Sequence, residues 1–263
     1  NLDPDKVEAA ITPKTTAILP VHVFGNPCNT ERFQQIADTY GLKLVYDAAH
    51  AFGVKINGNS ILNFGDLSIL SFHATKSFNT FEGGAIISHD EKVKKRIDLL
   101  KNFGFANETT VIEPGINGKM NEIQAAFGLV QLKHIDRYVA KRKEVTALYR
   151  EKLAGIKGIR CLHDKEGIMH SYSFFPILIN AQFYGRSRNE VYEELKKNHI
   201  FSRRYFFPLI SQFPTYRNLL SAAKENLPIA EEVTDQILCL PLFDDMDAEI
   251  TTKICRLLKS WSI

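Results

Sequence analysis

The feature that most constrains the fold is a strand–helix–strand pattern within the first fifty residues. Residues 17–24 form a mostly apolar run that ends at Gly25, which predicts a buried strand followed by a turn. Apolar residues at helical spacing then follow Thr30 and stop at Gly41, and residues 42–46 predict a second strand. Because such a unit joins parallel strands through a crossover helix, the pattern predicts an α/β fold built on a mostly parallel sheet.

Alternating strand and helix patterns continue along the first half of the chain. Apolar runs predict strands at 67–72 and 84–88, Asp90 is placed to cap a helix, and the Gly- and Pro-containing stretch 103–118 predicts a loop. A long helical pattern begins near Met120. Its apolar stripe is expected to be buried and consists of Ile123, Ala126, Phe127, Val130 and Ile135.

The pattern changes near residues 155–158, where two glycines stand close together. Beyond this point the sequence predicts a strand at about 172–179 and helices at about 188–198 and 247–260. We therefore predict a larger domain over residues 1–135 and a smaller C-terminal α+β domain over residues 136–263.

The start of the chain is unusual for a complete domain. It opens on Asn-Leu-Asp-Pro-Asp without a Met, and Asp3-Pro4 is typical of a helix N-terminus. We therefore expect a fold that is truncated at its N-terminus. A sheet that lacks its leading elements would expose apolar surface.

Composition and charge exclude several classes of protein. The chain has 33 Lys and Arg against 30 Asp and Glu, a net charge of +3, so no nucleic-acid partner is expected. No apolar run reaches the roughly 18 residues of a membrane span, so no membrane contact is expected. The eight histidines form no ligand-spaced pair and no G-x-G-x-x-G follows a strand, so neither a metal nor a dinucleotide is predicted. Cysteines without a C-x-x-C pair suit a cytoplasmic location, and these are Cys28, Cys161, Cys239 and Cys255.

Chemically useful side chains follow two of the predicted strands. Asp47 comes directly after one strand, and Ser71, His73 and Lys76 come at or after the end of another. Because ligands of parallel α/β sheets gather at the carboxyl ends of the strands, these residues are candidates for one site. A lone lysine or aspartate at such a place is also compatible with a solvated amine or a turn residue.

Three segments together remove that ambiguity. They are DAAHAFG at 47–53, SFHATKSFNTFEGGA at 71–85 and GINGKMNEIQAA at 115–126. In this order and spacing they resemble the DegT/DnrJ/EryC1/StrS family, whose members are sugar aminotransferases that depend on pyridoxal phosphate (PLP). The resemblance extends from residue 1 to the end of the chain. It implies the fold-type I, aspartate-aminotransferase-like fold.

The resemblance also implies the roles of five residues. Lys76 matches the lysine whose amine condenses with the PLP aldehyde and later moves a proton. Asp47 matches the carboxylate that keeps the cofactor's pyridine nitrogen protonated. His50 matches a position beside the cofactor ring, and Ser71 a hydroxyl that contacts the cofactor phosphate. Asn117 matches an asparagine that reaches the phosphate from a partner subunit, which implies a homodimer with a shared active site.

The implied reaction moves an amino group from L-glutamate to a nucleotide-linked keto-6-deoxy sugar, for the synthesis of a surface polysaccharide. The Phe-His-Ala-Thr-Lys stretch that ends at Lys76 favours the family branches that act on C4 of the sugar. Arg203, Arg204 and Tyr205 match a segment that helps to bind the substrate, and arginine suits a nucleotide diphosphate.

Two other interpretations stay open at this point. PLP sugar dehydratases related to this family carry histidine in place of the lysine, so Lys76 argues against dehydration. The second alternative is a non-catalytic, truncated remnant or subunit that binds no cofactor, because the Gly-containing turn that cradles the PLP phosphate in the family is not found here. The presence of Asp47, Lys76 and Asn117 together favours the enzyme.

Overall fold

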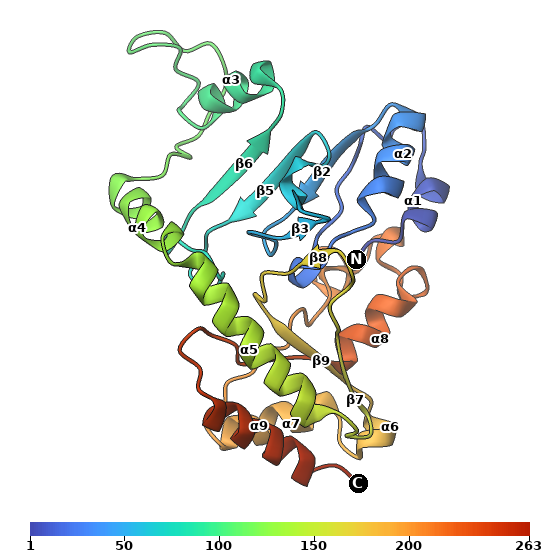
Figure 1. Cartoon of the computed structure of the whole chain (residues 1–263). Coiled ribbons are helices and arrows are strands. Elements are labelled where there is room, and N and C mark those ends of the chain that lie inside the picture. The colour runs from blue at the N-terminus through green and yellow to red at the C-terminus, as the bar shows by residue number, and fades with distance from the viewer. The chain divides into compact units, whose positions relative to one another are not determined.

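The computed structural model describes all residues, 1–263, as two compact units (Figure 1). The first unit comprises Asn1–Arg137 together with Lys165–Ser173, and the second comprises Tyr138–Asp164 and Phe174–Ile263. The division predicted at residue 135 did not include this return of residues 165–173 to the first unit. No local pattern in the sequence marks the return, because it depends on contacts with residues far away in the chain.

The first unit is built on the predicted strand–helix–strand pattern. Its main sheet has the order β1-β2-β5-β6, in which β1 with β2 and β2 with β5 are parallel and β5 with β6 is antiparallel. The mostly parallel sheet is therefore confirmed. The bounds of the four strands are Ala17–Ile18 (β1), Lys43–Asp47 (β2), Leu67–Ser71 (β5) and Gly84–Ser88 (β6).

The first strand is much shorter than the predicted run 17–24. Regular pairing of β1 stops at Ile18, and only a single bridge from Val21 to Asp47 follows. Pro20, between them, has no N–H to donate to a neighbouring strand. Residues Val23–Gly25 then turn into a short 3₁₀ segment.

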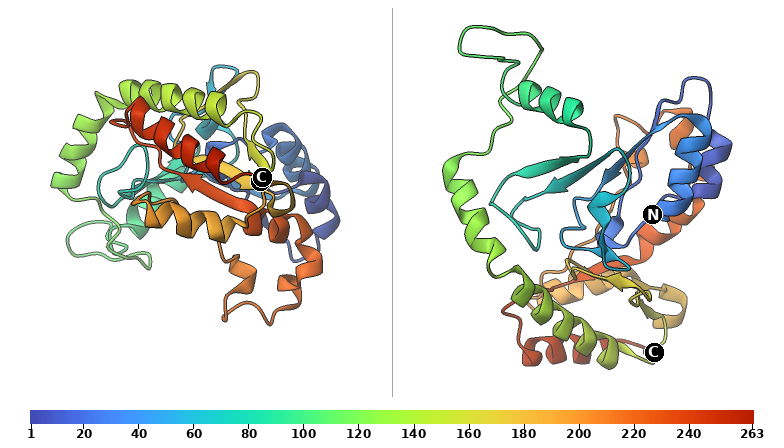
Figure 2. Two further views of the ribbon diagram at one scale, coloured as in Figure 1. Left: turned by 90° about the horizontal axis from the view of Figure 1, so that it is seen from below. Right: turned by 45° about the horizontal axis from the view of Figure 1, so that its top comes forward.

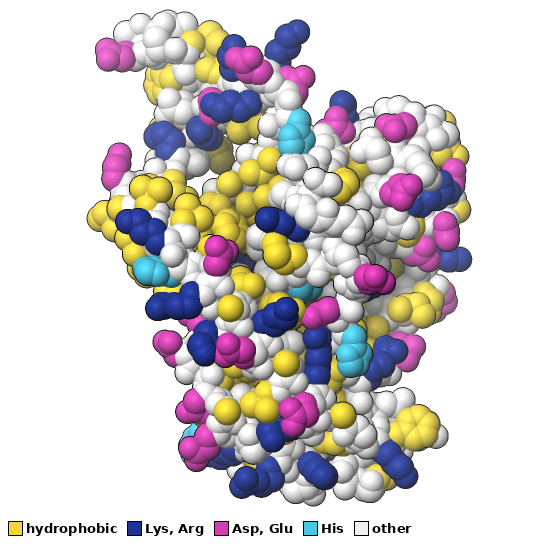
Figure 3. Space-filling model, in the orientation of Figure 1, with side chains coloured by type: hydrophobic (Ala, Val, Ile, Leu, Met, Phe, Trp, Pro, Cys, Tyr) yellow, Lys and Arg dark blue, Asp and Glu magenta, His cyan; other side chains and the backbone are white.

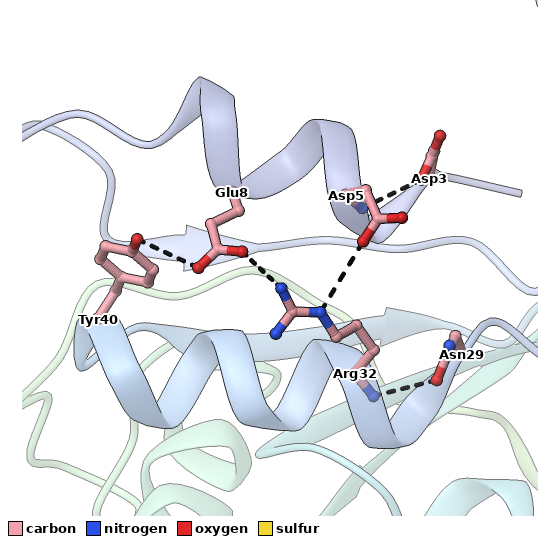
Figure 4. Close-up of polar contacts among 6 residues, drawn as sticks. All are labelled: Asp3, Asp5, Glu8, Asn29, Arg32 and Tyr40. Carbon is pink, nitrogen blue, oxygen red and sulfur yellow. Dashed lines mark hydrogen bonds and ion pairs between the residues drawn. The ribbon is translucent and has the colours of Figure 1, made fainter.

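Four helices belong wholly to the first unit, and the first two pack together near β1 and β2. Glu8 of the first helix and Arg32 of the second form an ion pair, Asp5 lies 4.0 Å from the same guanidinium, and the Tyr40 hydroxyl donates to Glu8 (Figure 4). The pairing fixes the first helix against the second. The helices are Pro4–Ala10 (α1), Thr30–Tyr40 (α2), Glu91–Leu100 (α3) and Glu122–Leu132 (α4).

A small antiparallel sheet holds the returning segment against the first unit. Its order is β4-β3-β8, with β4 and β8 both antiparallel to β3. The segment 165–173 therefore extends a hairpin that lies more than one hundred residues earlier in the chain. The three strands are Lys55–Ile56 (β3), Asn59–Ser60 (β4) and Ile168–Met169 (β8).

One of the two core clusters of the first unit lies between α2 and the main sheet. Phe33 and Ile36 of α2 and Leu44 and Tyr46 of β2 are each fully buried in one cluster. The 3.6-residue spacing of apolar residues on α2 and the alternation on β2 bring these side chains to the same interface.

We expect Phe33→Ala to lower the free energy of unfolding by about 3–5 kcal/mol, because it removes a ring that has no solvent exposure and leaves a cavity. Urea denaturation followed by circular dichroism measures the loss. Phe201→Ala is the matched control, since that ring is 68% exposed and its removal should change the unfolding free energy by about 0.5 kcal/mol or less. Equal losses in the two variants would contradict this description of the core.

The stripe predicted to be buried on residues 123–135 is largely wrong. Ile123 and Val130 of α4 are 78% and 52% exposed, and apolar side chains gather over α4 and the neighbouring strands β5 and β6 (Figure 3). The helix docks instead through Gly128, where a Cβ would lie 3.0 Å from the Thr80 methyl group. Helical spacing shows that one face is apolar, but it does not show what covers that face.

The long helical pattern that begins near Met120 is divided into two helices. α4 ends at Leu132, and α5 (Ile135–Leu153) begins after a two-residue break and continues into the second unit. Between α3 and α4, the stretch 103–118 contains no helix or strand, so the predicted loop is confirmed (Figure 1).

The second unit is an antiparallel sheet with helices packed on it, which confirms the α+β character predicted for this part. The strand order is β10-β9-β7, and α5 and α9 lie side by side (Figure 2). Residues of β9, β10, α5, α7 and α9 share one core cluster. The elements are Ile159–Cys161 (β7), Phe175–Ile179 (β9), Ala181–Tyr184 (α6), Arg188–Lys197 (α7), Pro228–Gln236 (α8), Ile237–Leu240 (β10) and Ala248–Ser260 (α9).

None of the helices combines the length and the apolar character that crossing a membrane requires.

Candidate active site

The ends of two parallel strands bring the first site residues together. Asp47 is the last residue of β2 and pairs in register with Ile69 of β5, two residues before Ser71 ends that strand. The Asp47 carboxylate accepts a hydrogen bond of 2.9 Å from the Ala49 backbone N–H, which holds the side chain in an Asx-type turn. The Ser71 hydroxyl accepts from the His73 backbone N–H at 3.3 Å. Both side chains are half-buried, so a ligand can still reach them.

Lys76 stands on a turn just beyond the end of β5. Its backbone N–H donates to the His73 carbonyl at 2.9 Å, and the two residues after it, Ser77 and Phe78, are buried. The Phe78 ring stacks on Phe52 at a centroid distance of 4.3 Å. The turn is therefore anchored immediately after the lysine, while Lys76 itself stays half-buried.

Asp47, His50 and Lys76 interact electrostatically. Burial lowers the pKa of Lys76, and the Asp47 carboxylate partly opposes the effect by raising it. Burial also lowers the pKa of His50 to about 4, with a further lowering from Lys76 and an opposing contribution from Asp47. These mutual effects show that the structure brings the three predicted side chains to one site. The arrangement provides an amine that releases its proton more readily than an exposed lysine does.

His50 is held as a neutral hydrogen-bond donor. Its Nδ1 accepts a hydrogen bond of 3.1 Å from the Phe24 backbone N–H, so that nitrogen carries no proton. The remaining proton of the neutral ring is on Nε2. With its pKa at about 4, the ring is neutral at pH 7 and its Nε2–H can donate.

His22 is a buried residue near the site that sequence reasoning did not single out. Its ring is fully buried and stacks on Tyr46 at 4.6 Å, and its Nδ1 accepts from the Cys28 backbone N–H at 3.0 Å. Burial lowers the pKa of His22 to about 4, although the nearby Asp47 carboxylate raises it in part. The one available signal was a polar residue inside the apolar run 17–24.

We expect acid to destabilise the protein partly through His22. The pKa of His22 falls from an ordinary 6.5 to about 4 on folding, so between these values the unfolded chain binds more protons than the folded one. The stabilisation is present above pH 6.5 and is lost as the pH falls toward 4, by about 3 kcal/mol. His22→Asn, which keeps an acceptor for Cys28, should lose less unfolding free energy than the wild type between pH 6.5 and 4.5. His163→Asn, at an exposed position, is the control and should match the wild type.

The turn after the lysine is closed by a tight return to β5. Gly84 pairs with Ser71, and a Cβ on Gly84 would lie 2.6 Å from the Leu70 carbonyl oxygen. Exposed His73 has its Nε2 3.4 Å from a Glu82 carboxylate oxygen. The glycine at position 84 therefore has a structural reason, which is the close approach of β6 to β5.

The other predicted residues lie away from the strand ends. Asn117 is an exposed residue of the loop between α3 and α4 and forms a bridge with Asn102. In the second unit, Arg203 pairs with Cys239 of β10, and the Tyr205 ring stacks on Phe206 at 5.0 Å.

Arg204 is held against the surface of α7. Its guanidinium lies 4.3 Å from the Tyr192 ring centroid and donates to the Asn189 side chain at 3.0 Å. Buried Arg188, whose pKa is lowered by burial and by Arg204, stacks on Phe207 at 4.5 Å.

The structure contains no group of three His, Cys, Asp or Glu side chains that could hold a metal ion.

Nearly the whole chain is similar to known proteins. Residues 1–259 match the model of the DegT/DnrJ/EryC1/StrS aminotransferase family. The chain is 55% identical over 259 residues to a dTDP-4-amino-4,6-dideoxy-D-glucose transaminase of Escherichia coli, a match that covers 98% of this chain and 70% of the relative.

Solved structures show the same fold. The crystal structure of DesI in the presence of its TDP-sugar product superposes with a TM-score of 0.92 at 34% identity, over 98% of this chain and 65% of DesI. The PLP form of Spr1654 from Streptococcus pneumoniae gives a TM-score of 0.90 at 28% identity, over 98% of this chain and 71% of that protein. The predicted fold is therefore confirmed, and the chain spans about two thirds of the length of these relatives.

Proposed function

The chain belongs to the DegT/DnrJ/EryC1/StrS aminotransferase family, and on that premise we propose that it transfers an amino group to C4 of a dTDP-linked 4-keto-6-deoxy sugar with PLP as cofactor. The observation that carries the proposal is the placement of Lys76, on the turn that follows β5, within electrostatic reach of Asp47 at the end of the parallel neighbour β2. The name of the 55% identical Escherichia coli relative supports the nucleotide and the ring carbon.

The residues present fit PLP. The cofactor supplies an aldehyde that takes up an amino group and a pyridinium ring that accepts electrons. The Lys76 amine, with its lowered pKa, suits attack on an aldehyde at neutral pH. The Asp47 carboxylate suits a protonated ring nitrogen, and the Ser71 hydroxyl can donate to a phosphate oxygen.

The chain's own residues then handle protons and charge. When the amino donor displaces Lys76 from the cofactor, the Lys76 amine becomes free. As a general base it would then take a proton from the donor's Cα, and as a general acid it would deliver that proton. The donor, L-glutamate in our proposal, is oxidised to its 2-oxo acid, while the sugar carbonyl at C4 is converted to an amine. Arg203 and Arg204 carry the positive charge that suits the diphosphate of the sugar nucleotide. The product is an amino sugar for a surface polysaccharide, and we place the reaction in the cytoplasm.

The first experiment is the absorbance spectrum of the purified chain with added PLP, before and after borohydride reduction, followed by mass mapping. We expect a band at about 410–430 nm and a reduced adduct on Lys76. Turnover is then measured with L-glutamate and a dTDP-4-keto-6-deoxy sugar. A chain with no band and no adduct would contradict the proposed cofactor, and an adduct without turnover would contradict the proposed substrate.

We also propose that the enzyme is a homodimer with a shared active site. The exposed apolar face of α4 supports this, since Ile123, Leu129 and Val130 are 52–78% exposed. Asn117 lies in the loop that leads into this helix, where it could reach a partner's cofactor phosphate.

We expect Val130→Glu to convert a dimer into a monomer, because it places a charge within the proposed contact. Light scattering coupled to size exclusion measures the mass. Gln34→Glu, on the exposed face of α2, is the control and should leave the mass unchanged. A wild-type chain that is monomeric at all concentrations would contradict the dimer.

A further inference from the structure

Three buried hydroxyl groups form a chain that ends next to Lys76. The Ser77 Oγ lies 3.0 Å from the Ser173 Oγ, which in turn lies 3.0 Å from the Ser171 Oγ. All three side chains are buried. Because a hydroxyl has one proton and two lone pairs, Ser173 can donate to at most one of these neighbours and accepts from the other, so both bonds can form at once.

The chain of hydroxyls connects parts of the first unit that are far apart in sequence. Ser77 and Ser173 are separated by 96 residues, and Ser173 is the last residue of the segment that returns from the second unit. No backbone pairing joins the Lys76 turn to this segment. The hydroxyl chain is therefore a direct polar link between the turn that carries Lys76 and residues 171–173.

The same returning segment also packs against Gly25, which lies next to His50. A Cβ on Gly25 would lie 3.3 Å from the Ser171 Oγ and 2.8 Å from the His50 carbonyl oxygen. Gly25 has a φ of +81° and so fills this narrow space without a side chain. The segment 171–173 thus contacts the surroundings of both His50 and Lys76.

We propose that Ser173 is a positioning residue for Lys76, which acts through its hydrogen bond to Ser77 and holds the turn so that the lysine amine stays partly buried beside Asp47. Phe78 anchors the turn through its aromatic contacts, but it does not connect the turn to residues 171–173. Without the Ser173 hydroxyl, the buried Ser77 hydroxyl loses its partner, and the turn relaxes toward water. The inference rests on the proposed function only in treating the Lys76 amine as the reactive group.

The test measures the amine without any cofactor. The full chain is treated with trace acetic anhydride between pH 6 and 10, and the acetylation rates of Lys76 and of exposed Lys92 are read by mass mapping. In the wild type, Lys76 should titrate at lower pH than Lys92. In Ser173→Ala, the Lys76 titration should move toward that of Lys92, so that labelling at pH 8 falls about threefold to tenfold.

Two further variants make the result specific. Ser77→Ala should have the same effect, and the double variant should add little, because both changes remove the same Ser77–Ser173 hydrogen bond. Ser68→Ala is the matched control, since Ser68 is equally buried on β5 and its hydroxyl has no hydrogen-bond partner. It should leave Lys76 labelling unchanged. Should Ser173→Ala fail to fold, Ser77→Ala decides the question.

Each outcome separates the inference from the proposed function. The positioning role of Ser173 would be overturned if the Lys76 titration were unchanged in both Ser173→Ala and Ser77→Ala. It would also be overturned if Ser68→Ala shifted the Lys76 titration equally. Either result would leave the proposed function intact. A wild-type Lys76 that titrates with Lys92 would count against the reactive amine that the proposed function requires, and the positioning role would fall with it.

Discussion

Lys76→Ala is expected to abolish transamination and to remove the borohydride-stable adduct with PLP. The variant lacks both the amine that attacks the cofactor aldehyde and the group that moves the proton, so turnover should fall about a thousandfold or more. The measurement is the rate of amino-sugar formation from L-glutamate and a dTDP-4-keto-6-deoxy sugar. Added PLP should no longer give the absorbance band of the wild-type complex.

The structure also predicts that Lys76→Ala folds normally. The side chain is half-buried and carries a lowered pKa, so its removal costs little packing and relieves the desolvation of an amine. Lys92→Ala on exposed α3 is the control, and it should retain full activity. Turnover that is unchanged in a folded Lys76→Ala enzyme would refute the proposed mechanism.

Asp47→Asn is expected to lower turnover about a hundredfold or more while leaving the turn at the end of β2 intact. Asparagine keeps an oxygen that can accept from the Ala49 backbone N–H, so the change removes charge without removing the local hydrogen bond. A neutral amide cannot hold a proton on the cofactor's ring nitrogen, and electrostatic stabilisation of this kind is worth several kcal/mol. Steady-state kinetics with saturating PLP measures the loss.

A second measurement distinguishes this electrostatic role from a loss of structure. Asp47 raises the pKa of Lys76 against the effect of burial, so Asp47→Asn should move the Lys76 titration to still lower pH. Asp38→Asn on the exposed face of α2 should change neither turnover nor the titration. Wild-type turnover in Asp47→Asn would show that Asp47 does not pair with the cofactor.

Much of the fold was predictable because it rests on local periodicity. The helix at Thr30–Tyr40 and the strands at Lys43–Asp47 and Gly84–Ser88 lie within a residue or so of their predicted bounds. Periodic apolar residues and helix-ending glycines act over a few residues, so they can be read directly from the chain. The same holds for Asp47 and Ser71, since a parallel sheet brings the ends of neighbouring strands together.

Other features could not be predicted because they depend on residues that are far apart in sequence. The apolar stripe of α4 was expected to be buried, but the helix docks through Gly128 and leaves Ile123 and Val130 exposed. The return of residues 165–173 to the first unit had no local signal at all. Periodicity identifies an apolar face, whereas burial depends on which distant element packs against it.

The sequence by itself determined the strand–helix order, the residue types at the strand ends and the family to which the chain belongs. Only the tertiary structure decided the ionisation of Lys76, His50 and His22, because desolvation and neighbouring charges arise when distant segments meet. It also placed Ser173 against Ser77 across 96 residues of chain. A hydrogen bond of that kind leaves no spacing pattern, since either serine on its own is an ordinary polar residue.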